Sequence, residues 1–308
     1  MDELNRLRYR LSPPPEVVEW VTFDDSQSRS MLFGEKVHLV PYIKPRGYLA
    51  AGRVLSLAFR ILRRGRFDRV VSTGSGIALP FLTAGRALGL ECHYIESAAR
   101  TTGPSLSGAL VGRLPGTHGY TQHPAWSSPR WSYRGSLFDG YQAVAPPPGS
   151  RPPPARRVVV TLGTMRTYGF RRAVDRLHEL LPLVCGPQAE VLWQVGGTEV
   201  ADLGISAPAR IPADEMTAAI RAADLVVAHA GIGSALAALD AGRCPVLLPR
   251  RVEHGEHVDD HQRLIAQALA ERGLAVSRDP ADLTVADLLA AMGTRIITDR
   301  ESAPFELD

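Results

Sequence analysis

A proline-rich run near the middle of the chain constrains its fold more than any other segment. Residues 145–155 read Ala-Pro-Pro-Pro-Gly-Ser-Arg-Pro-Pro-Pro-Ala. Proline lacks a backbone N–H and fixes φ, so this run cannot form a helix or an inner strand and favours extended geometry. It predicts a linker at residues 146–156 between one domain of residues 1–145 and another of residues 157–308. Each half has the size of an ordinary domain, about 100–200 residues.

Strand-like and helix-like segments alternate in both halves. In the first half, strands are expected at 18–22, 37–40, 69–72 and 91–95, and helices at 49–64 and 79–88. In the second half, strands are expected at 158–161, 190–194, 224–228 and 246–248, and helices at 169–181, 212–222, 235–241 and 261–272. This alternation favours parallel sheets with right-handed crossovers. The predicted fold class is α/β, with two Rossmann-like doubly wound domains and a cleft between them.

The first eleven residues depart from this order. Leu4, Leu7 and Leu11 have helical spacing, which predicts a helix over residues 1–11. A doubly wound domain usually opens with a strand before its first helix. The first strand is therefore expected to be absent from this sequence.

A glycine turn marks the most informative candidate site. The segment His229-Ala-Gly-Ile-Gly-Ser234 follows a β-branched run and precedes a strong helix former. Free N–H groups and the helix dipole at such a helix start favour an anion, most often a phosphate. Similar turns occur at 72–76 and 161–164, although a single glycine turn also serves close packing alone. Neither 72–76 nor 229–234 fits Gly-x-Gly-x-x-Gly, and no Walker sequence occurs, which argues against dinucleotide oxidoreductases and P-loop NTPases.

A polar loop follows the next expected strand. It carries Glu253, His254, Glu256, His257, Asp259, Asp260, His261 and Gln262. The spacing fits no standard zinc site, so hydrogen bonding to a polar ligand such as a sugar is favoured over metal binding or a merely solvated loop. Two consecutive strand ends with polar side chains predict a ligand cleft at the carboxyl edge of a parallel sheet.

Two further features of the first half each allow two interpretations. Glu96 follows an expected strand and is a candidate base or acceptor binder; the alternative is a helix cap or an ion pair with Arg100. Five arginines interleave with apolar residues in the 49–66 segment (Arg53, Arg60, Arg63, Arg64 and Arg66). Such a helix either lies on an anionic membrane surface or packs its apolar face on its own sheet.

Charge and composition exclude several classes of protein. The net charge of +3 is too small to indicate a nucleic-acid partner. The three cysteines, Cys92, Cys185 and Cys244, lie far apart and are expected to be free thiols in a cytoplasmic protein. No apolar run reaches the length of about 18–20 residues that spans a bilayer, and no signal peptide is visible.

These segments resemble a family of sugar transferases. The second half is similar to the Alg13-type catalytic domain and the first half to the Alg14-type domain, an order found fused in bacterial exopolysaccharide glycosyltransferases of the family 28 type. The matching segments are 71–76, 94–97 with 105–108, 160–164, 229–234 and 255–262. The resemblance implies a GT-B fold and an inverting, metal-independent hexosyltransferase that needs no cofactor beyond a UDP-sugar or other NDP-sugar as co-substrate. It implies a lipid-linked (polyprenyl) or small-molecule acceptor and contact with the inner membrane face as a peripheral protein, and it leaves a homodimer or a partner protein open.

The resemblance also assigns roles to individual residues. The donor diphosphate would be held by Thr164, His229, Gly231, Gly233 and Ser234. The donor sugar would be met by Glu256, His257, Asp260, His261 and Gln262, and the nucleobase by Ile211 and Met216.

Two departures from the family bear on function. Relatives carry a ribose-binding Glu where Ala237 stands here, and Asp240 is the nearest substitute. Relatives also begin with a strand and a Gly-Gly-His loop whose histidine is a candidate base; Glu96 and His123 are the expected catalytic replacements, with His118 as a third candidate. These departures leave a non-catalytic nucleotide-sugar-binding partner subunit as one alternative to a transferase. A UDP-sugar 2-epimerase, which has the same type of fold, is the other.

Overall fold

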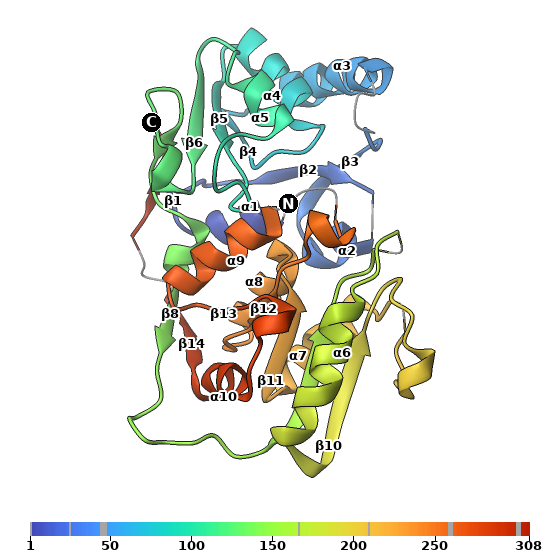
Figure 1. Cartoon of the computed structure of the whole chain (residues 1–308). Helices are drawn as coiled ribbons and strands as arrows, with labels where there is room; N and C mark the ends of the chain where they lie inside the picture. Colours follow the sequence, from blue (N-terminus) through green and yellow to red (C-terminus); the bar gives the residue numbers. More distant parts are fainter. Residues whose placement is uncertain are drawn as a thin grey trace. The chain divides into compact units, whose positions relative to one another are not determined.

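The chain folds into two compact units (Figure 1). A computed structural model describes residues 2–24, 26–43, 48–165, 167–208, 210–257, 261–299 and 303–308. Unit 1 comprises Met1–Asp139 and Arg300–Asp308, and unit 2 comprises Gly140–Asp299. The division lies just before the proline-rich run. The last residues belong to unit 1, whereas the sequence predicted one continuous domain for residues 157–308.

Unit 2 is built on a parallel five-stranded sheet. The strand order is β10–β9–β11–β12–β13. The strands are β9 (Ala155–Thr161), β10 (Cys185–Gln194), β11 (Leu225–His229), β12 (Val246–Leu248) and β13 (Val276–Ser277). The chain moves outward from β9 to β10 and then returns to β11 on the other side of β9. The carboxyl ends of β9 and β11 therefore flank a topological switch point, where doubly wound folds bind their ligands.

Helices cover both faces of this sheet. They are α6 (Arg171–Leu180), α7 (Ala213–Ala222), α8 (Ile232–Asp240), α9 (His261–Glu271) and α10 (Val285–Gly293). Successive residues of β9 point to opposite faces. Val158 and Val160 pack in the cluster that includes α6 and α10, whereas Val159 packs with Ile220 of α7 and Ala238 of α8. The β-branched run in β9 is thus buried on both sides, as expected for an inner parallel strand.

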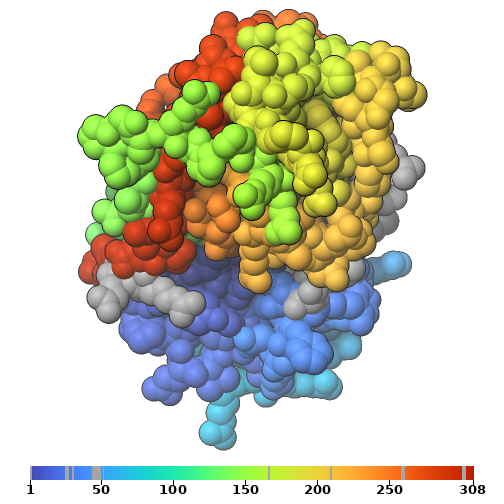
Figure 2. Space-filling view, turned by 90° about the horizontal axis from the view of Figure 1, so that it is seen from below, coloured from blue at the N-terminus to red at the C-terminus, as the bar shows by residue number. Residues whose placement is uncertain are grey.

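The proline-rich run lies on the surface of unit 2. Its residues are mostly exposed, and this part of the chain appears in green on the surface in Figure 2. It joins β8 (Tyr141–Val144) to β9, and β8 pairs antiparallel with β14 (Arg295–Thr298). The run therefore connects two strands of the same unit.

Unit 1 contains three separate parallel pairings. One sheet pairs β2 (Glu19–Phe23) with β3 (Lys36–Val40). Another has the order β4–β5–β6–β7, from β4 (Arg69–Ser72), β5 (Glu91–Ile95), β6 (Thr117–Thr121) and β7 (Ser132–Tyr133). The third pairs β1 (Leu11–Ser12) with β15 (Phe305–Glu306) and brings the last residues into this unit.

Five α-helices belong to unit 1 among the described residues: α1 (Asp2–Leu7), α2 (Ser26–Met31), α3 (Tyr48–Arg64), α4 (Ala78–Ala87) and α5 (Leu106–Val111). The arginine-rich helix α3 buries Val54, Ala58 and Leu62 in a core shared with α4, and its arginines are exposed. Its apolar face thus packs on its own unit. Within the described ranges, every helix is too short or too polar to cross a bilayer.

Most of the predicted elements are confirmed. The strands at 69–72, 91–95 and 246–248 are correct to the residue, and helix α8 begins earlier than expected because the glycine turn itself enters the helix. The predicted helix over residues 1–11 ends at Leu7. The elements that the sequence did not reveal include β6, β13, β14 and α10.

Candidate functional site

The glycine turn of unit 2 leaves an uncapped helix start at the switch point. β11 ends at His229 and α8 begins at Ile232, with Gly231 as the N-cap residue in extended geometry (φ −82°, ψ 135°). Glycine has no side chain to accept from the first turn, so no side chain caps this helix. The N–H groups of Ile232, Gly233 and Ser234 thus point beyond the helix end, where the dipole also favours negative charge.

The position of the His229 imidazole explains why residues 163 and 231 are glycines. Its Nδ1 lies 3.3 Å from the Thr161 carbonyl oxygen, which can only accept, so Nδ1–H donates and Nε2 carries the lone pair. A Cβ at Gly163 would lie 3.2 Å from the ring, and a Cβ at Gly231 would overlap Nε2. Gly163 also needs its left-handed backbone (φ 90°). By contrast, nothing lies within 4 Å of a Cβ at Gly233, which faces open space.

Burial keeps His229 neutral. Desolvation lowers the pKa of His229 to about 4, against the opposing effect of its bond to Thr161. Arg250 and His257 lower this pKa further. At neutral pH the turn therefore presents a neutral ring, and any charge on a bound anion is met by backbone N–H groups.

The stability of unit 2 is expected to fall in acid because of His229. The unfolded chain binds a proton below an ordinary pKa of 6.5, whereas the native ring resists protonation to about 4. The stabilisation is present above pH 6.5 and is lost as pH falls towards 4. At about 1.4 kcal/mol per pKa unit, the free energy of unfolding relative to His229→Gln should drop by up to about 3 kcal/mol. Urea unfolding of the unchanged protein and of His229→Gln at pH 7 and pH 4 measures this difference in the free energy of unfolding. The same dependence on pH in both proteins would contradict the prediction.

A buried arginine, which the sequence did not single out, ties the site loops together. Arg250 follows β12 and is 2% exposed. Its Nη2 donates to Leu162 O at 2.7 Å, and its Nη1 donates to Tyr168 O at 3.0 Å, Gly169 O at 3.2 Å and Glu256 O at 3.2 Å. The guanidinium lies 5.0 Å from the centre of the Phe170 ring. Arg250 thus joins the loop after β9 to the polar loop after β12.

The predicted sugar-binding residues fall into two groups. Glu256 is buried, and its carboxylate accepts from Arg172 Nε at 2.9 Å, Arg172 Nη2 at 3.0 Å and the Arg251 N–H at 3.0 Å. Buried Gln262 accepts the Arg250 N–H at 3.1 Å. These two side chains hold the loop in place.

His257 and His261 form the second group. They are half-buried, and their rings meet edge to face at 5.1 Å between centres. Asp260 lies outside the described residues. Among those that are described, no group of three or more His, Cys, Asp or Glu side chains has a metal-holding arrangement.

The predicted nucleobase and phosphate residues also lie at this edge of unit 2. The Ile211 N–H donates to Gln194 Oε1 at 2.9 Å, and Gln194 Nε2 donates to Thr161 Oγ1 at 3.1 Å. That Ile211 N–H is therefore engaged within the protein and is not available to a base. Met216 is half-buried on α7, and Thr164 is exposed in the turn after β9.

Asp240, the expected substitute for a carboxylate at Ala237, is hydrogen-bonded within unit 2. It is the last residue of α8, six residues beyond Ser234, which places it about 9 Å further along the helix. Its Oδ1 accepts from the Tyr141 hydroxyl.

Glu96 of unit 1 is hydrogen-bonded to two neighbouring segments of the chain, at Ser97 and at Ser105, the N-cap residue of α5. It is 1% exposed, and its Oε2 accepts from the Ser105 N–H at 2.8 Å and the Ser105 hydroxyl at 3.1 Å. Its Oε1 accepts from the Ser97 N–H at 3.1 Å. A Cβ at Gly108 would overlap this carboxylate, so Glu96 and Gly108 pack as a unit at the start of α5.

The two histidine candidates of unit 1 lie at different edges of the sheet. His123 follows β6 and is 7% exposed, and its Nε2 donates to Ala98 O at 2.6 Å. His118 lies at the amino end of β6, stacked on His93 with 5.2 Å between ring centres. Only His123 therefore shares the carboxyl edge with Glu96, and His118 is wrongly placed to replace it.

A second carboxylate at this edge was missed. Glu3 of α1 accepts from the Ser97 hydroxyl at 2.6 Å, the Ala98 N–H at 2.9 Å and Gln122 Nε2 at 3.1 Å. Burial raises its pKa despite these bonds. A carboxylate with a raised pKa at a strand edge is a candidate acid or base. Only its place on the amphipathic first helix marked it in the sequence.

The sequence of this chain is similar to those of known glycosyltransferases. Residues 157–294 match the glycosyltransferase family 28 C-terminal domain. A UDP-N-acetylglucosamine–N-acetylmuramyl-(pentapeptide) pyrophosphoryl-undecaprenol N-acetylglucosamine transferase from Bordetella parapertussis is 26% identical over 301 residues, covering 90% of this chain and 81% of that protein. A protein of the same name from Parasynechococcus marenigrum is 30% identical over 243 residues, covering 74% of this chain and 62% of that protein.

Solved structures share the fold. MurG of Acinetobacter baumannii superimposes with a TM-score of 0.52 at 19% identity, covering 88% of this chain and 79% of that one. The UDP-GlcNAc 2-epimerase of Methanocaldococcus jannaschii gives a TM-score of 0.59 at 11% identity, covering 100% and 94%. The architecture is therefore GT-B: two doubly wound α/β domains with parallel sheets.

Proposed function

We propose that this chain, a GT-B glycosyltransferase whose residues 157–294 match the family 28 C-terminal domain, moves a sugar from a UDP-sugar to a lipid-linked acceptor with inversion. The observation that carries the proposal is the uncapped start of α8 at the switch point of unit 2. Ile232, Gly233 and Ser234 present their N–H groups beside a neutral His229. The leaving group of such a transfer is a nucleoside diphosphate, whose growing charge these donors and the helix dipole stabilise without a metal ion.

The polar loop after β12 supplies the proposed sugar-binding side. His257 and His261 are half-buried and meet ring to ring, so they are the side chains best placed to meet sugar hydroxyls. Glu256 and Gln262 contribute by fixing the loop through Arg172 and Arg250. Asp260 remains part of the proposal as a predicted sugar contact.

The acceptor side is assigned to unit 1. An attacking hydroxyl needs a base, and three groups lie at the carboxyl edge of β5 and β6: Glu3, Glu96 and His123. All three are hydrogen-bonded, and Glu3 is the strongest candidate because it is only partly buried and its pKa is raised, whereas Glu96 and His123 are almost fully buried. We assign the base to Glu3, ahead of the two residues that the sequence favoured.

A lipid-linked acceptor would bring the protein to the inner membrane face. The exposed arginines of α3 provide an electrostatic contact with anionic lipids, worth about 1 kcal/mol each near the surface. Insertion of the helix is not part of the proposal, because Val54, Ala58 and Leu62 are committed to the core of unit 1.

Donor binding tests the proposal directly. A panel of UDP- and dTDP-sugars is scanned by thermal shift, followed by UDP-release assays with lipid-linked and small acceptors. We expect a UDP-sugar to raise the melting temperature and the double variant Gly233→Val with Ser234→Ala to abolish the shift. Asp240→Asn, at the far end of the same helix, is the matched control and should retain it.

The same assay separates the transferase from its alternatives. Release of UDP only with acceptor, unchanged by EDTA, supports the proposed reaction. A new UDP-sugar epimer formed without acceptor identifies an epimerase. Donor binding without turnover on any acceptor identifies a partner subunit, and no shift with any nucleotide sugar refutes the donor site itself.

A further inference from the structure

A chain of hydrogen bonds joins the last residues of three neighbouring strands in unit 2. β10 ends at Gln194, β9 at Thr161 and β11 at His229. Gln194 Nε2 donates to Thr161 Oγ1 at 3.1 Å, and His229 Nδ1 donates to the Thr161 carbonyl oxygen at 3.3 Å. The Oε1 of the Gln194 amide accepts from the Ile211 N–H at 2.9 Å. These bonds run across the carboxyl edge of the sheet from Ile211 to His229, and we call them the Gln194 relay.

The relay needs both an acceptor and a donor in the side chain of residue 194. A backbone N–H can only donate, so the atom of Gln194 that faces Ile211 is the carbonyl Oε1, and the NH₂ group faces Thr161. Gln194 and Thr161 are register partners on adjacent strands, which places their side chains on the same face of the sheet. Both side chains are buried, and a buried polar network rigidifies its members when every bond is made.

The bond from Ile211 is the polar tether of the segment that precedes α7. Among the described residues of 205–211, none lies in a helix or strand, and this bond is the one hydrogen bond that they make. Ile205 and Ala207 add apolar packing against the core. Pro212, the N-cap residue of α7, has no side-chain capping bond. The position of Ile211 relative to the sheet edge therefore depends on Gln194.

The relay connects the two sides of the proposed donor site. One end is Ile211, which with Met216 is expected to receive the nucleobase. The other end is His229, at the start of the turn that is expected to receive the diphosphate. A nucleoside diphosphate meets both sides at once, so its affinity depends on how firmly the distance between them is set before binding.

We propose that Gln194 is a positioning residue of the donor site, which through Thr161 holds the nucleobase side at the distance from the His229 turn that a nucleoside diphosphate requires. The inference rests on the proposed function and assigns no ligand contact to Gln194, because both ends of its amide already bond within the protein. Loss of the relay should therefore weaken ligands that span both sides and spare those that meet only the diphosphate side.

Three substitutions in the full chain test the relay. Gln194→Met keeps the length of the side chain and removes both of its bonds. Thr161→Val keeps the shape and removes only the hydroxyl, whereas Thr161→Ser retains the hydroxyl and is the conservative variant. The affinities for UDP and for inorganic diphosphate are measured by NMR titration, observed at the amides of Ile232–Ser234.

The two ligands should respond differently. Gln194→Met should weaken UDP binding at least about tenfold, as expected for the loss of two buried hydrogen bonds, and change diphosphate affinity by less than about twofold. Thr161→Val should weaken UDP binding about threefold to tenfold, and Thr161→Ser should restore it to within about twofold. A general loss of stability would lower both affinities or neither.

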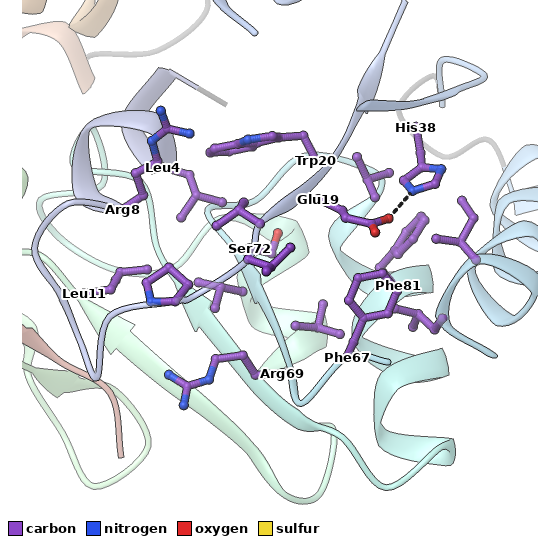
Figure 3. Close-up of a pocket in the computed structure, with 18 of the residues that line it drawn as sticks. Leu4, Arg8, Leu11, Glu19, Trp20, His38, Phe67, Arg69, Ser72 and Phe81 are labelled. Carbon is purple, nitrogen blue, oxygen red and sulfur yellow. Dashed lines mark hydrogen bonds and ion pairs between the residues drawn. The ribbon is translucent and has the colours of Figure 1, made fainter. Parts of the chain in front are cut away.

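Thr22→Val in unit 1 is the matched control. Thr22 lies on β2, the strand that carries Glu19 and Trp20 beside the cavity in Figure 3. It is buried like Thr161, and its hydroxyl shares a hydrogen bond with the Ser28 hydroxyl at 3.1 Å. Thr22→Val therefore removes a comparable bond at the end of another parallel strand, and it should leave the affinities for UDP and diphosphate unchanged.

The outcomes separate this inference from the proposed function. Equal losses of UDP and diphosphate affinity in Gln194→Met, or no loss of either, would overturn the positioning role and leave the donor site in place. A Thr161→Ser variant that binds UDP no better than Thr161→Val would overturn it as well. An unchanged protein that binds neither ligand would refute the proposed function and the relay's role together.

Discussion

Arg250→Met is expected to lower the free energy of unfolding of unit 2 by about 4 kcal/mol and to abolish donor binding. The change leaves the buried carbonyl oxygens of Leu162 and Glu256 without this donor, and each unsatisfied buried group costs about 1–3 kcal/mol. The loops after β9 and β12 then lose their common anchor. Hydrogen exchange of β9 and β11 reports on unit 2 alone, and a UDP thermal shift reports on the site.

The neighbouring arginine provides the control for this experiment. Arg251 is the same residue type, more exposed, and pairs with Glu253 at 2.7 Å near the surface. Arg251→Met should cost about 1 kcal/mol, because water reaches the one-quarter-exposed side chain and weakens its ion pairs with Glu253 and Asp279. Equal losses in the two variants would show that position 250 has no special role.

Gly231→Ala is expected to destabilise unit 2 by about 1–3 kcal/mol and to weaken donor binding at least tenfold. The added methyl overlaps His229 Nε2, so either the imidazole or the start of α8 must move. The backbone of Gly231 suits alanine, so the clash is the cause of the loss. In the His229→Ala background the ring is absent, so Gly231→Ala should hardly change the free energy of unfolding. A double-mutant cycle measures this coupling between the two positions.

Gly233→Ala is the matched control for the glycine turn. Its methyl meets nothing within 4 Å, and alanine favours the helix, so stability should be kept or raised. If the open space at Gly233 receives the diphosphate, affinity for UDP falls although stability does not. Destabilisation by Gly233→Ala equal to that by Gly231→Ala would contradict the distinction between a packing glycine and a ligand glycine.

The sequence predicted helices and strands correctly where the signal lay in neighbouring residues. The β-branched runs of β9 and β11 predicted inner strands, and the glycine turn at 229–234 predicted a strand-to-helix junction. Helix α10 was missed although Thr284 and Asp287 form a capping box, which was a usable signal. Strand β6 was hidden by Gly119, where a Cβ would lie 2.7 Å from Arg130 O.

The site residues show why local patterns were not enough. Arg250 meets carbonyl groups from 162 and 168–169, so its burial depends on loops more than eighty positions away. Glu96 and Glu3 are both carboxylates at one sheet edge, and only the tertiary hydrogen bonds distinguish an anchor from a partly exposed acid with a raised pKa. Roles carried over from the family point to this set of loops, and the structure shows which of their side chains hold the loops together.

The parallel pairing of β1 with β15 has a consequence for how the protein is made. Leu11 lies opposite Phe305, so unit 1 contains a strand that is synthesised after all of unit 2. At about 5–20 residues per second, the ribosome needs about 10–30 s to go from residue 139 to residue 305. During that interval β15 does not yet exist, so β1 cannot form this pairing. Unit 1 therefore gains its last strand only after the whole of unit 2 has been synthesised.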